Sequence, residues 1–386
     1  MRSLDDARDV CERYHPGMCV ALANVPLARR EAPGGPVLGI FRQFSGPRLM
    51  VPEEYGGAGV NALSAARVVR AMSSYSPSLG AATTMHHYTV ATLFSLAKTA
   101  GRLTPAQLDL LAKIAPGNLI VASGWAEGKP GANIVIPAVT ARNTDGGYLV
   151  NGGKKPCSLA RSMDLLTASA TVSVDGTPTL ALLLIPASSP GITVHKFWLS
   201  NVLAGAESDE VRLADVFVPA ELVIRTEPDD PGRLDDLQTV GFAWFEMLAT
   251  SVYVGAASAL VEQALTGGRG SVTDRAQAAI QLESAVALVE GAARALDDGL
   301  TGDAAVSAVL VARYAAQQAL RAAADMAAEL LGGIAFMRSP DIAYLIAAVR
   351  PLAYHPPSRT AMADALIGYF TGQPLRLSLR ARPPTS

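Results

Sequence analysis

A histidine stands at a sharp break near the C-terminal end of the sequence. The stretch RPLAYHPPSRTA, residues 350–361, places His355 directly before two prolines. Consecutive prolines end helices, because each lacks a backbone donor and restricts the residue before it. An imidazole has a pKa of about 6.5 in water, so it both donates and accepts protons near neutral pH. His355 is therefore a candidate catalytic group on a loop between helices. The alternative is a surface histidine on that loop.

Two further histidines stand side by side in TTMHHYTV, residues 83–90. Neighbouring residues on a helix point about 100° apart, so at most one of His86 and His87 faces a given site. The chain has five histidines in all, and two together mark a second candidate position. We favour His87 as the catalytic member of the pair. The alternative is a hydrogen-bonded histidine at a surface where helices pack.

The composition argues against several classes of function. The 386 residues carry a formal net charge of -2, and the sequence pI is about 6.2. A nucleic-acid-binding domain typically has a basic stripe and a pI above about 9. We expect no apolar run approaching the roughly 20 residues of a membrane span, and no signal peptide. Cys11, Cys19 and Cys157 are odd in number and form no CxxC pair, which favours neither disulfides nor a metal site and predicts a cytoplasmic protein.

The elements that must position these residues fall into three zones. Residues 1–118 show helical periodicity, with two helices that meet at Ser76-Pro77-Ser78. Residues 119–232 alternate apolar and polar positions between turns, as strands do, and NTDGGYLV predicts a hairpin. Residues 233–386 return to Ala-rich helices, predicted at 238–265, 273–299, 303–331 and 340–350. This order predicts an α+β protein without a Rossmann sheet.

Five short motifs together resemble the acyl-CoA dehydrogenase superfamily, over essentially the full length of the chain. They are VPEEYGGAG (51–59), AEGKPGAN (126–133), YLVNGGKKPCS (148–158), RLADVFVP (212–219) and AAELLGG (327–333). Each motif alone is weak, but their order on a helix–sheet–helix chain is specific. The resemblance implies an N-terminal helical domain (1–118), a middle β-barrel or sandwich domain (119–232) and a C-terminal four-helix bundle (233–386). It also implies a homodimer or homotetramer.

The resemblance further implies a flavin between the β-domain and the C-terminal helices. Ser158 lies where the family has a Thr that hydrogen-bonds flavin N5, and it keeps the hydroxyl. The alternative is a serine in a turn at the end of a strand. The implied flavin loop, which acts mostly through backbone groups, contains Ser123, Trp125, Ala126 and Glu127. The Glu127 side chain has either a flavin role or a solvated or helix-capping role. Gly332 and Gly333 are the implied flavin contacts across the subunit interface, with Arg269 or Arg275 as a source of positive charge.

Two departures from the family's pattern bear on the reaction. In the dehydrogenases a Glu removes the substrate's α-proton, and LAYHPPSR places His355 on that Glu. Flavin monooxygenases of the superfamily show this change. The stretch GGRGSVTDRAQAA (267–279) lacks the family's Arg-x-x-Phe-Gly for the FAD pyrophosphate, and Glu329 replaces a Gln. A carboxylate repels a pyrophosphate. These changes favour reduced FMN, or loosely held FAD, delivered by a separate flavin reductase.

The favoured function is a flavin-dependent monooxygenase that uses reduced flavin and O2 through a C4a-hydroperoxyflavin. Ser158 would hold N5. His355 and one of the histidine pair would stabilise the peroxide and direct the proton of a small organic or carrier-bound substrate. One alternative is an acyl-CoA or acyl-carrier-protein dehydrogenase with Glu246 as base, although that residue lies one position off and its side chain should point away. Another is a flavin-free scaffold that kept the fold.

Overall fold

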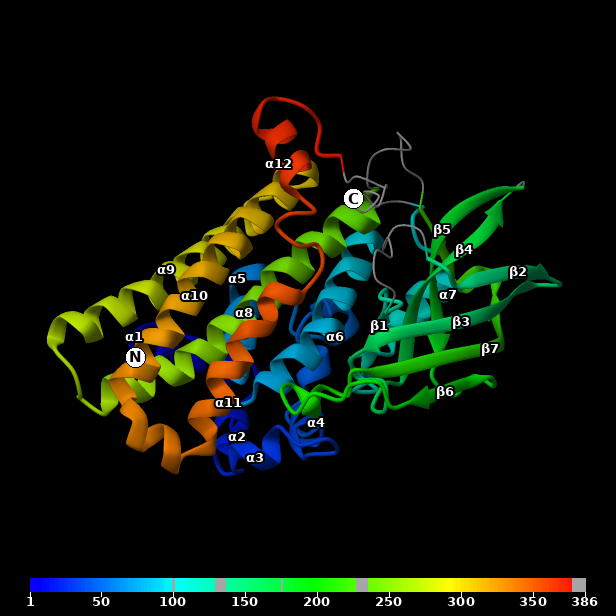
Figure 1. Cartoon of the computed structure of the whole chain (residues 1–386). Helices are drawn as coiled ribbons and strands as arrows, with labels where there is room; N and C mark the ends of the chain where they lie inside the picture. Colours follow the sequence, from blue (N-terminus) through cyan, green and yellow to red (C-terminus); the bar gives the residue numbers. More distant parts are fainter. Residues whose placement is uncertain (99–100, 129–136, 175, 227–234, 377–386) are drawn as a thin grey trace, which may run out of the picture.

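The structure, a computed structural model, describes residues 1–98, 101–128, 137–174, 176–226 and 235–376. Helices, then a sheet, then helices follow one another along the chain (Figure 1). The sheet lies on one side of the molecule, and the long C-terminal helices pack with α5 (Ala62–Tyr75) and α6 (Pro77–Ala97) on the other. The predicted α+β class is confirmed.

The N-terminal part is helical. Its two longest helices, α5 (Ala62–Tyr75) and α6 (Pro77–Ala97), meet at Ser76, as predicted. The Ser76 hydroxyl accepts a hydrogen bond from the Leu79 N–H, and Pro77 takes the first helical position, so α6 has a strong start signal. The other elements are α1 (Arg2–Tyr14), α2 (Met18–Ala23), α3 (Leu27–Arg30), α4 (Val37–Gln43), α7 (Pro105–Ala112), and the 3-10 turns η1 (Gly46–Arg48) and η2 (Glu53–Tyr55).

The strands of the described residues form one sheet with the order β6-β7-β3-β2-β4-β5-β8, and β1 pairs with β4. The hairpin predicted at NTDGGYLV is confirmed, because β2 and β3 pair antiparallel up to Thr144 and Gly147. The strand β1 runs parallel to β4 and lies beside α6. The bounds are β1 (Val121–Gly124), β2 (Thr140–Thr144), β3 (Gly147–Cys157), β4 (Leu165–Val174), β5 (Thr177–Pro186), β6 (Ile192–His195), β7 (Asp209–Pro219) and β8 (Val223–Arg225), with the 3-10 turns η3 (Ala204–Ala206) and η4 (Ala220–Leu222).

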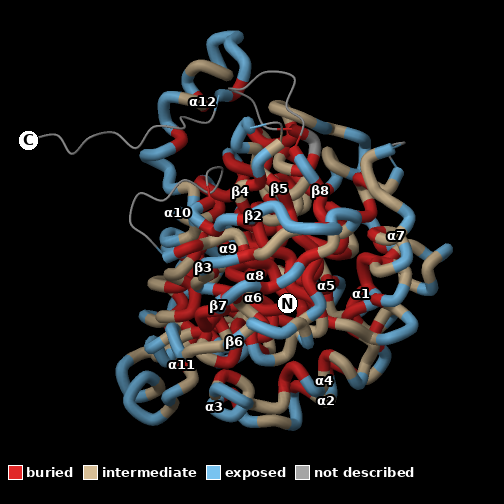
Figure 2. Tube along the Cα trace, turned by 90° about the vertical axis from the view of Figure 1, so that its right-hand side faces the viewer, coloured by how far each residue is buried: buried red, intermediate tan, exposed pale blue. Residues whose placement is uncertain are grey.

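Helix α8 (Asp236–Thr266) is the central helix of the C-terminal part. It packs against α5, α6, α9 (Val272–Asp297), α10 (Gly302–Arg338) and α11 (Pro340–Val349). Figure 2 shows α6 and α8 in the buried centre. One expectation is corrected here, because Leu237–Thr266 is long and apolar enough to cross a membrane. Since 89% of its apolar window is buried in this structure, α8 has the character of a core helix.

The Pro-Pro break lies between α11 and the last helix. Helix α11 ends in the 3-10 turn η5 (Arg350–Tyr354), and His355 follows in an extended conformation before α12 (Ala363–Phe370). A second break lies inside α10, where Gly332 has φ 79° and ψ 165°. That region of backbone space is open essentially to glycine alone. The helix end predicted at residue 331 coincides with this kink.

Candidate active site

His355 lies against the middle of α8. Its Nε2 shares a hydrogen bond of 2.5 Å with the Tyr253 hydroxyl. Its ring packs on those of Tyr253 and Phe245, with centroids 5.5 and 5.9 Å away. The preceding Tyr354 is 79% exposed, so the turn points one side chain outwards and the next inwards. His355 itself is partly buried, and its ring is held against α8, so it is not a free surface side chain.

The His355 imidazole is neutral at neutral pH. Burial, helped by the positive charge of Arg313, lowers its pKa to about 4. Burial also raises the pKa of the Tyr253 hydroxyl well above its ordinary range. The expectation of an imidazole that titrates near pH 7 is thus corrected. The two side chains form an uncharged hydrogen-bonded pair.

A series of ring contacts connects His355 to strand β1. Phe245 lies between His355 and Tyr88 of α6, whose ring centroid is 5.3 Å from that of Phe245. The Tyr88 hydroxyl hydrogen-bonds to Ser123 Oγ, and burial raises its pKa to about 12. Cys157, the last residue of β3, directs its thiol to the Ser123 carbonyl, 3.7 Å away. The structure therefore links the start of the implied flavin loop to the C-terminal turn.

Ser158 follows β3 beside a second hydroxyl. Its Oγ lies 2.9 Å from Ser208 Oγ. The neighbours of this pair, Leu159 and Glu207, have positive φ angles of 65° and 54°. Such backbone strain persists only where the surroundings impose it, and it clusters at functional sites. Ser158 is partly exposed, so a ligand can approach its hydroxyl.

Glu127 anchors its own loop. Its carboxylate accepts hydrogen bonds from the backbone N–H groups of Ala138 and Val139 and forms a 2.8 Å ion pair with Lys154. Lys154 is fully buried. Removing either side chain would leave the other as a buried charge without a partner. The Glu127 side chain thus anchors the backbone that precedes β2, and it is neither solvated nor at a helix end.

The other described residues of this loop contribute backbone and an aromatic ring. Trp125 is partly exposed and packs against the hydrophobic core. The Ala126 carbonyl accepts the Lys155 N–H at 2.8 Å, which ties the loop to β3. Residues 129–136, which hold most of the AEGKPGAN motif, lie outside the described residues.

The histidine pair of α6 is fully buried, and its two members differ. The His86 ring nitrogens lie 3.0 Å from the Val121 N–H and 2.8 Å from the Pro47 carbonyl. Both are engaged by backbone groups, so His86 packs β1 on α6 and has no free nitrogen for catalysis. Neither His87 nitrogen has a hydrogen-bond partner among the described residues. The side chain of this stretch that reaches Ser123 is the next one, Tyr88.

Glu246 is directed toward the same turn as His355, contrary to the expectation that it points away. Its carboxylate forms a 2.6 Å ion pair with Arg313 of α10, and the two side chains are 0% and 1% exposed. Arg313 also donates to the His355 carbonyl. Burial raises the pKa of Glu246 to about 7, against the lowering effect of Arg313. A carboxylate held by a buried guanidinium is not free to reach a thioester, which counts against the dehydrogenase alternative.

The turn between α8 and α9, which holds Arg269, and the last part of α10, which holds Gly332 and Gly333, lie at the end of the helices farthest from the sheet (Figure 1). The Arg269 guanidinium donates to the Leu331 carbonyl at 3.3 Å and lies 3.6 Å from where a Cβ on Gly332 would be. In one chain these two segments are therefore far from β3, which ends just before Ser158. A flavin contact shared by both groups therefore needs a second subunit, and it stays a prediction.

The residues between β1, β3 and α8 fit a flavin. The flavin ring needs apolar walls and a few fixed hydrogen-bonding groups. Trp125 and Phe245 are partly exposed aromatic rings, and the Ser158–Ser208 pair supplies hydroxyls on strained backbone. These hydrogen-bonding side chains are neutral, which suits the ring system of the flavin. A contact between the flavin phosphate and Arg269 of a second copy stays a prediction.

Several contributing side chains were not predicted. Tyr253 lies seven residues after Glu246, and this two-turn spacing puts both on one face of α8. Arg313 is a lone charge in the apolar stretch AVSAVLVARYAAQQAL (305–320), and such a charge signals a buried partner. Those two signals were available in the sequence. Tyr88 and Phe245 gave none, because their roles depend on contacts between distant segments.

Comparisons with known proteins agree with this geometry. Residues 46–100 match the family described as acyl-CoA dehydrogenase, N-terminal domain. Isobutylamine N-hydroxylase of Streptomyces viridifaciens is 57% identical, over 98% of this chain and 100% of that protein. The chain belongs to the acyl-CoA dehydrogenase superfamily. Within the superfamily it is a flavin-dependent monooxygenase, as the sequence predicted, rather than an acyl-CoA dehydrogenase.

Two solved structures share the fold. KijD3, in complex with FMN and dTDP-3-amino-2,3,6-trideoxy-4-keto-3-methyl-D-glucose, has a TM-score of 0.80 at 21% identity, with 95% of this chain and 94% of that chain covered. XiaF from Streptomyces sp., in complex with FADH2 and glycerol, has a TM-score of 0.74 at 23% identity, with 98% of each chain covered. The predicted superfamily fold is confirmed.

Proposed function

We propose that this protein N-hydroxylates a small aliphatic primary amine with O2 and a reduced flavin, FMN or FAD. The observation that carries the proposal is the 57% identity with isobutylamine N-hydroxylase over the whole of that protein. In the balanced reaction the amine, O2 and reduced flavin give the N-alkylhydroxylamine, oxidised flavin and water. The flavin supplies the two electrons that reduce the second oxygen atom to water.

The charge state of the candidate site supports an amine substrate. Only the neutral amine has the free lone pair that attacks oxygen. The pKa of His355 is about 4 and that of Tyr253 is raised, so the pair is uncharged at neutral pH. A carboxylate at position 355 would instead stabilise the unreactive ammonium form. We assign the His355 imidazole to hold the amine, and the Tyr253 hydroxyl to orient the imidazole.

The hydroxyls of β3 and the aromatic rings have separate tasks in this proposal. We assign Ser158 to the flavin N5 edge and Ser208 to fix the direction of the Ser158 hydroxyl. Phe245 and Tyr88 fill the space between the two ends of the site. Their rings keep water away from the reacting atoms, which limits the loss of reducing equivalents as hydrogen peroxide.

We further propose a homodimer or homotetramer in the cytoplasm, supplied with flavin by a separate reductase. The turn between α8 and α9, which holds Arg269, lies far from the sheet, and this supports a second copy at the flavin site. Exposed apolar side chains lie near it at the end of α10, namely Ile334, Phe336 and Met337 at 60%, 52% and 77% exposure. Apolar surface of this kind suits a protein interface. The three cysteines are free and buried, as is common in a reducing compartment.

The test is to mix the purified protein with photoreduced FMN or FAD, O2 and isobutylamine. Mass spectrometry then gives the hydroxylamine formed per flavin oxidised, with hydrogen peroxide measured as the uncoupled product. We expect His355→Ala to lower this ratio roughly tenfold or more, because a small displacement of a positioned substrate is costly. His195→Ala, on β6, should leave it unchanged. Bleaching of bound flavin by an acyl thioester, without any hydroxylamine, would overturn the proposal.

A further inference from the structure

The turn that carries His355 is held through its main chain by two neighbouring residues of α10. The Arg313 guanidinium donates to three carbonyls of the turn, those of Leu352 (3.2 Å), His355 and Pro356 (3.4 Å). Tyr314 donates its hydroxyl to the next carbonyl, that of Pro357, at 3.0 Å. Proline has no N–H, so this segment cannot form an ordinary backbone ladder. Its conformation therefore depends on donors from α10.

The same guanidinium is fixed to α8. Arg313 forms the 2.6 Å ion pair with Glu246, in which both side chains are buried. A buried charge requires a partner, and the Glu246 carboxylate supplies it. The five donors of a guanidinium lie in one rigid plane. Because Nη1 donates to Glu246 within this plane, the direction of Nη2 toward the Leu352 and His355 carbonyls is set.

Helix α8 also holds the His355 side chain. Tyr253, two helical turns after Glu246 on the same face, hydrogen-bonds to His355 Nε2. The histidine is thus held at both ends, its carbonyl by Arg313 and its ring by Tyr253. We propose that Arg313 is a positioning residue for the monooxygenase reaction, which fixes the His355 imidazole against the amine through the main chain of the turn. This inference rests on the proposed function, since the amine is what the imidazole positions.

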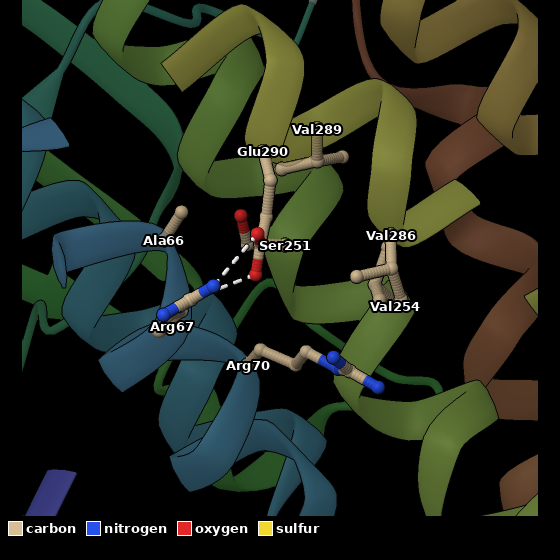
Figure 3. Close-up of a pocket in the computed structure, with 8 residues that line it drawn as sticks. All are labelled: Ala66, Arg67, Arg70, Ser251, Val254, Val286, Val289 and Glu290. Carbon is tan, nitrogen blue, oxygen red and sulfur yellow. Dashed lines mark hydrogen bonds and ion pairs between the residues drawn. The ribbon is translucent and has the colours of Figure 1, made fainter. Parts of the chain in front are cut away.

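The chain offers a matched control in Arg70 of α5, shown in Figure 3. Arg70 is 3% exposed and donates three hydrogen bonds, to Ser258 Oγ, the Ser3 carbonyl and Ser3 Oγ. It lines a cavity of about 10 Å³ between α5, α8 and α9, which holds at most one water molecule. Arg70 has no contact with the His355 turn among the described residues. Arg70 is therefore buried as Arg313 is, but it does not hold the turn that carries His355.

The experiment compares Arg313→Lys with Arg70→Lys in the full-length protein, with reduced FMN, O2 and isobutylamine. Lysine keeps the charge beside Glu246, but one ammonium group cannot reach all three carbonyls. We expect Arg313→Lys to lower kcat roughly 10- to 100-fold with little change in KM, as displacement of a positioned group does. Arg70→Lys should keep the wild-type kcat. In Arg313→Ala, added guanidinium should restore turnover, whereas methylammonium should not.

A second measurement does not depend on the amine. Hydrogen exchange, followed by mass spectrometry, should be faster over residues 350–360 in Arg313→Lys and unchanged there in Arg70→Lys. Equal losses of kcat in the two lysine variants, or wild-type exchange in the Arg313 variant, would overturn the role of Arg313. If the wild-type protein formed no hydroxylamine, the proposed function would fail, and the exchange comparison would still decide whether Arg313 holds the turn.

Discussion

Two arginine–glutamate pairs lie on different sides of helix α8, and their surroundings differ. Arg67 and Glu290 join α5 to α9 beside the small cavity, with side chains 27% and 14% exposed (Figure 3). Arg313 and Glu246 join α10 to α8 with side chains that are 1% and 0% exposed. The distances are similar, 2.8 and 2.6 Å. Only the second pair also holds backbone that carries a candidate catalytic residue.

The difference in burial reverses the direction in which the pKa of the glutamate carboxyl group is shifted. At Glu290, burial opposes ionisation, but Arg67 and Arg294 outweigh it and lower the pKa. At Glu246, complete burial outweighs Arg313 and raises the pKa to about 7. An ion pair near solvent adds little to stability, whereas a fully buried pair makes each partner indispensable to the other. The same two residue types therefore connect helices in one place and support a site in the other.

The largest expected contrast is in stability. Arg313→Met leaves the Glu246 carboxylate without its buried partner, so at pH 8 we expect a loss of about 3–5 kcal/mol in the free energy of unfolding. Arg67→Met removes a partly exposed pair and leaves Glu290 with Arg294, so we expect a loss of at most about 1 kcal/mol. Urea denaturation of both variants measures the two values. Similar losses in the free energy of unfolding would show that the difference in burial does not change how much each pair contributes to stability.

The next contrast concerns pH and has opposite signs for the two carboxyl groups. The raised pKa of Glu246 gives stability that is present below about pH 4.5 and is lost as the pH rises toward 7. Glu246→Gln should remove this loss, about 1.4 kcal/mol per pH unit in that window. The lowered pKa of Glu290 gives stability above about pH 4.5 that is lost on further acidification. Glu290→Gln should therefore change the profile only at the acidic end, as denaturation at a series of pH values will show.

The smallest contrast concerns single hydroxyls of α8. Tyr253→Phe removes the bond to His355, so we expect a loss of about 0.5–1.5 kcal/mol in stability and less hydroxylamine per flavin oxidised. Ser251→Ala, on the cavity side, removes only a bond to the Met247 carbonyl within the helix. It should leave the product ratio unchanged. If Tyr253→Phe formed as much hydroxylamine per flavin oxidised as the wild-type protein, the Tyr253 hydroxyl would have no role in the reaction.

The sequence predicted the fold well, because its signals are local. Proline at the start of α6, the Asp-Gly-Gly hairpin and the glycine breaks in the C-terminal part each act within a few residues. The domain limits at 118 and 232 stay predictions.

The site was predicted only in part. The roles of His355, His87 and Ser158 stay predictions. His86 has the helix-packing role that the sequence had left open, whereas the expectation that Glu246 points away was wrong. Arg313 pairs with a residue 67 positions away, and no local pattern specifies such a partner. The pKa of His355 likewise depends on burial that only the packed helices create.

The hold on the C-terminal turn has an evolutionary consequence. Arg313 and Tyr314 recognise carbonyl oxygens, which every amino acid offers alike. These contacts therefore do not depend on which side chain stands at position 355. A substitution there can change the chemistry presented to a bound flavin without dismantling the turn. That independence would let one scaffold carry a carboxylate in the dehydrogenases that this chain resembles and an imidazole here, and it makes position 355 a natural place to redirect the reaction by design.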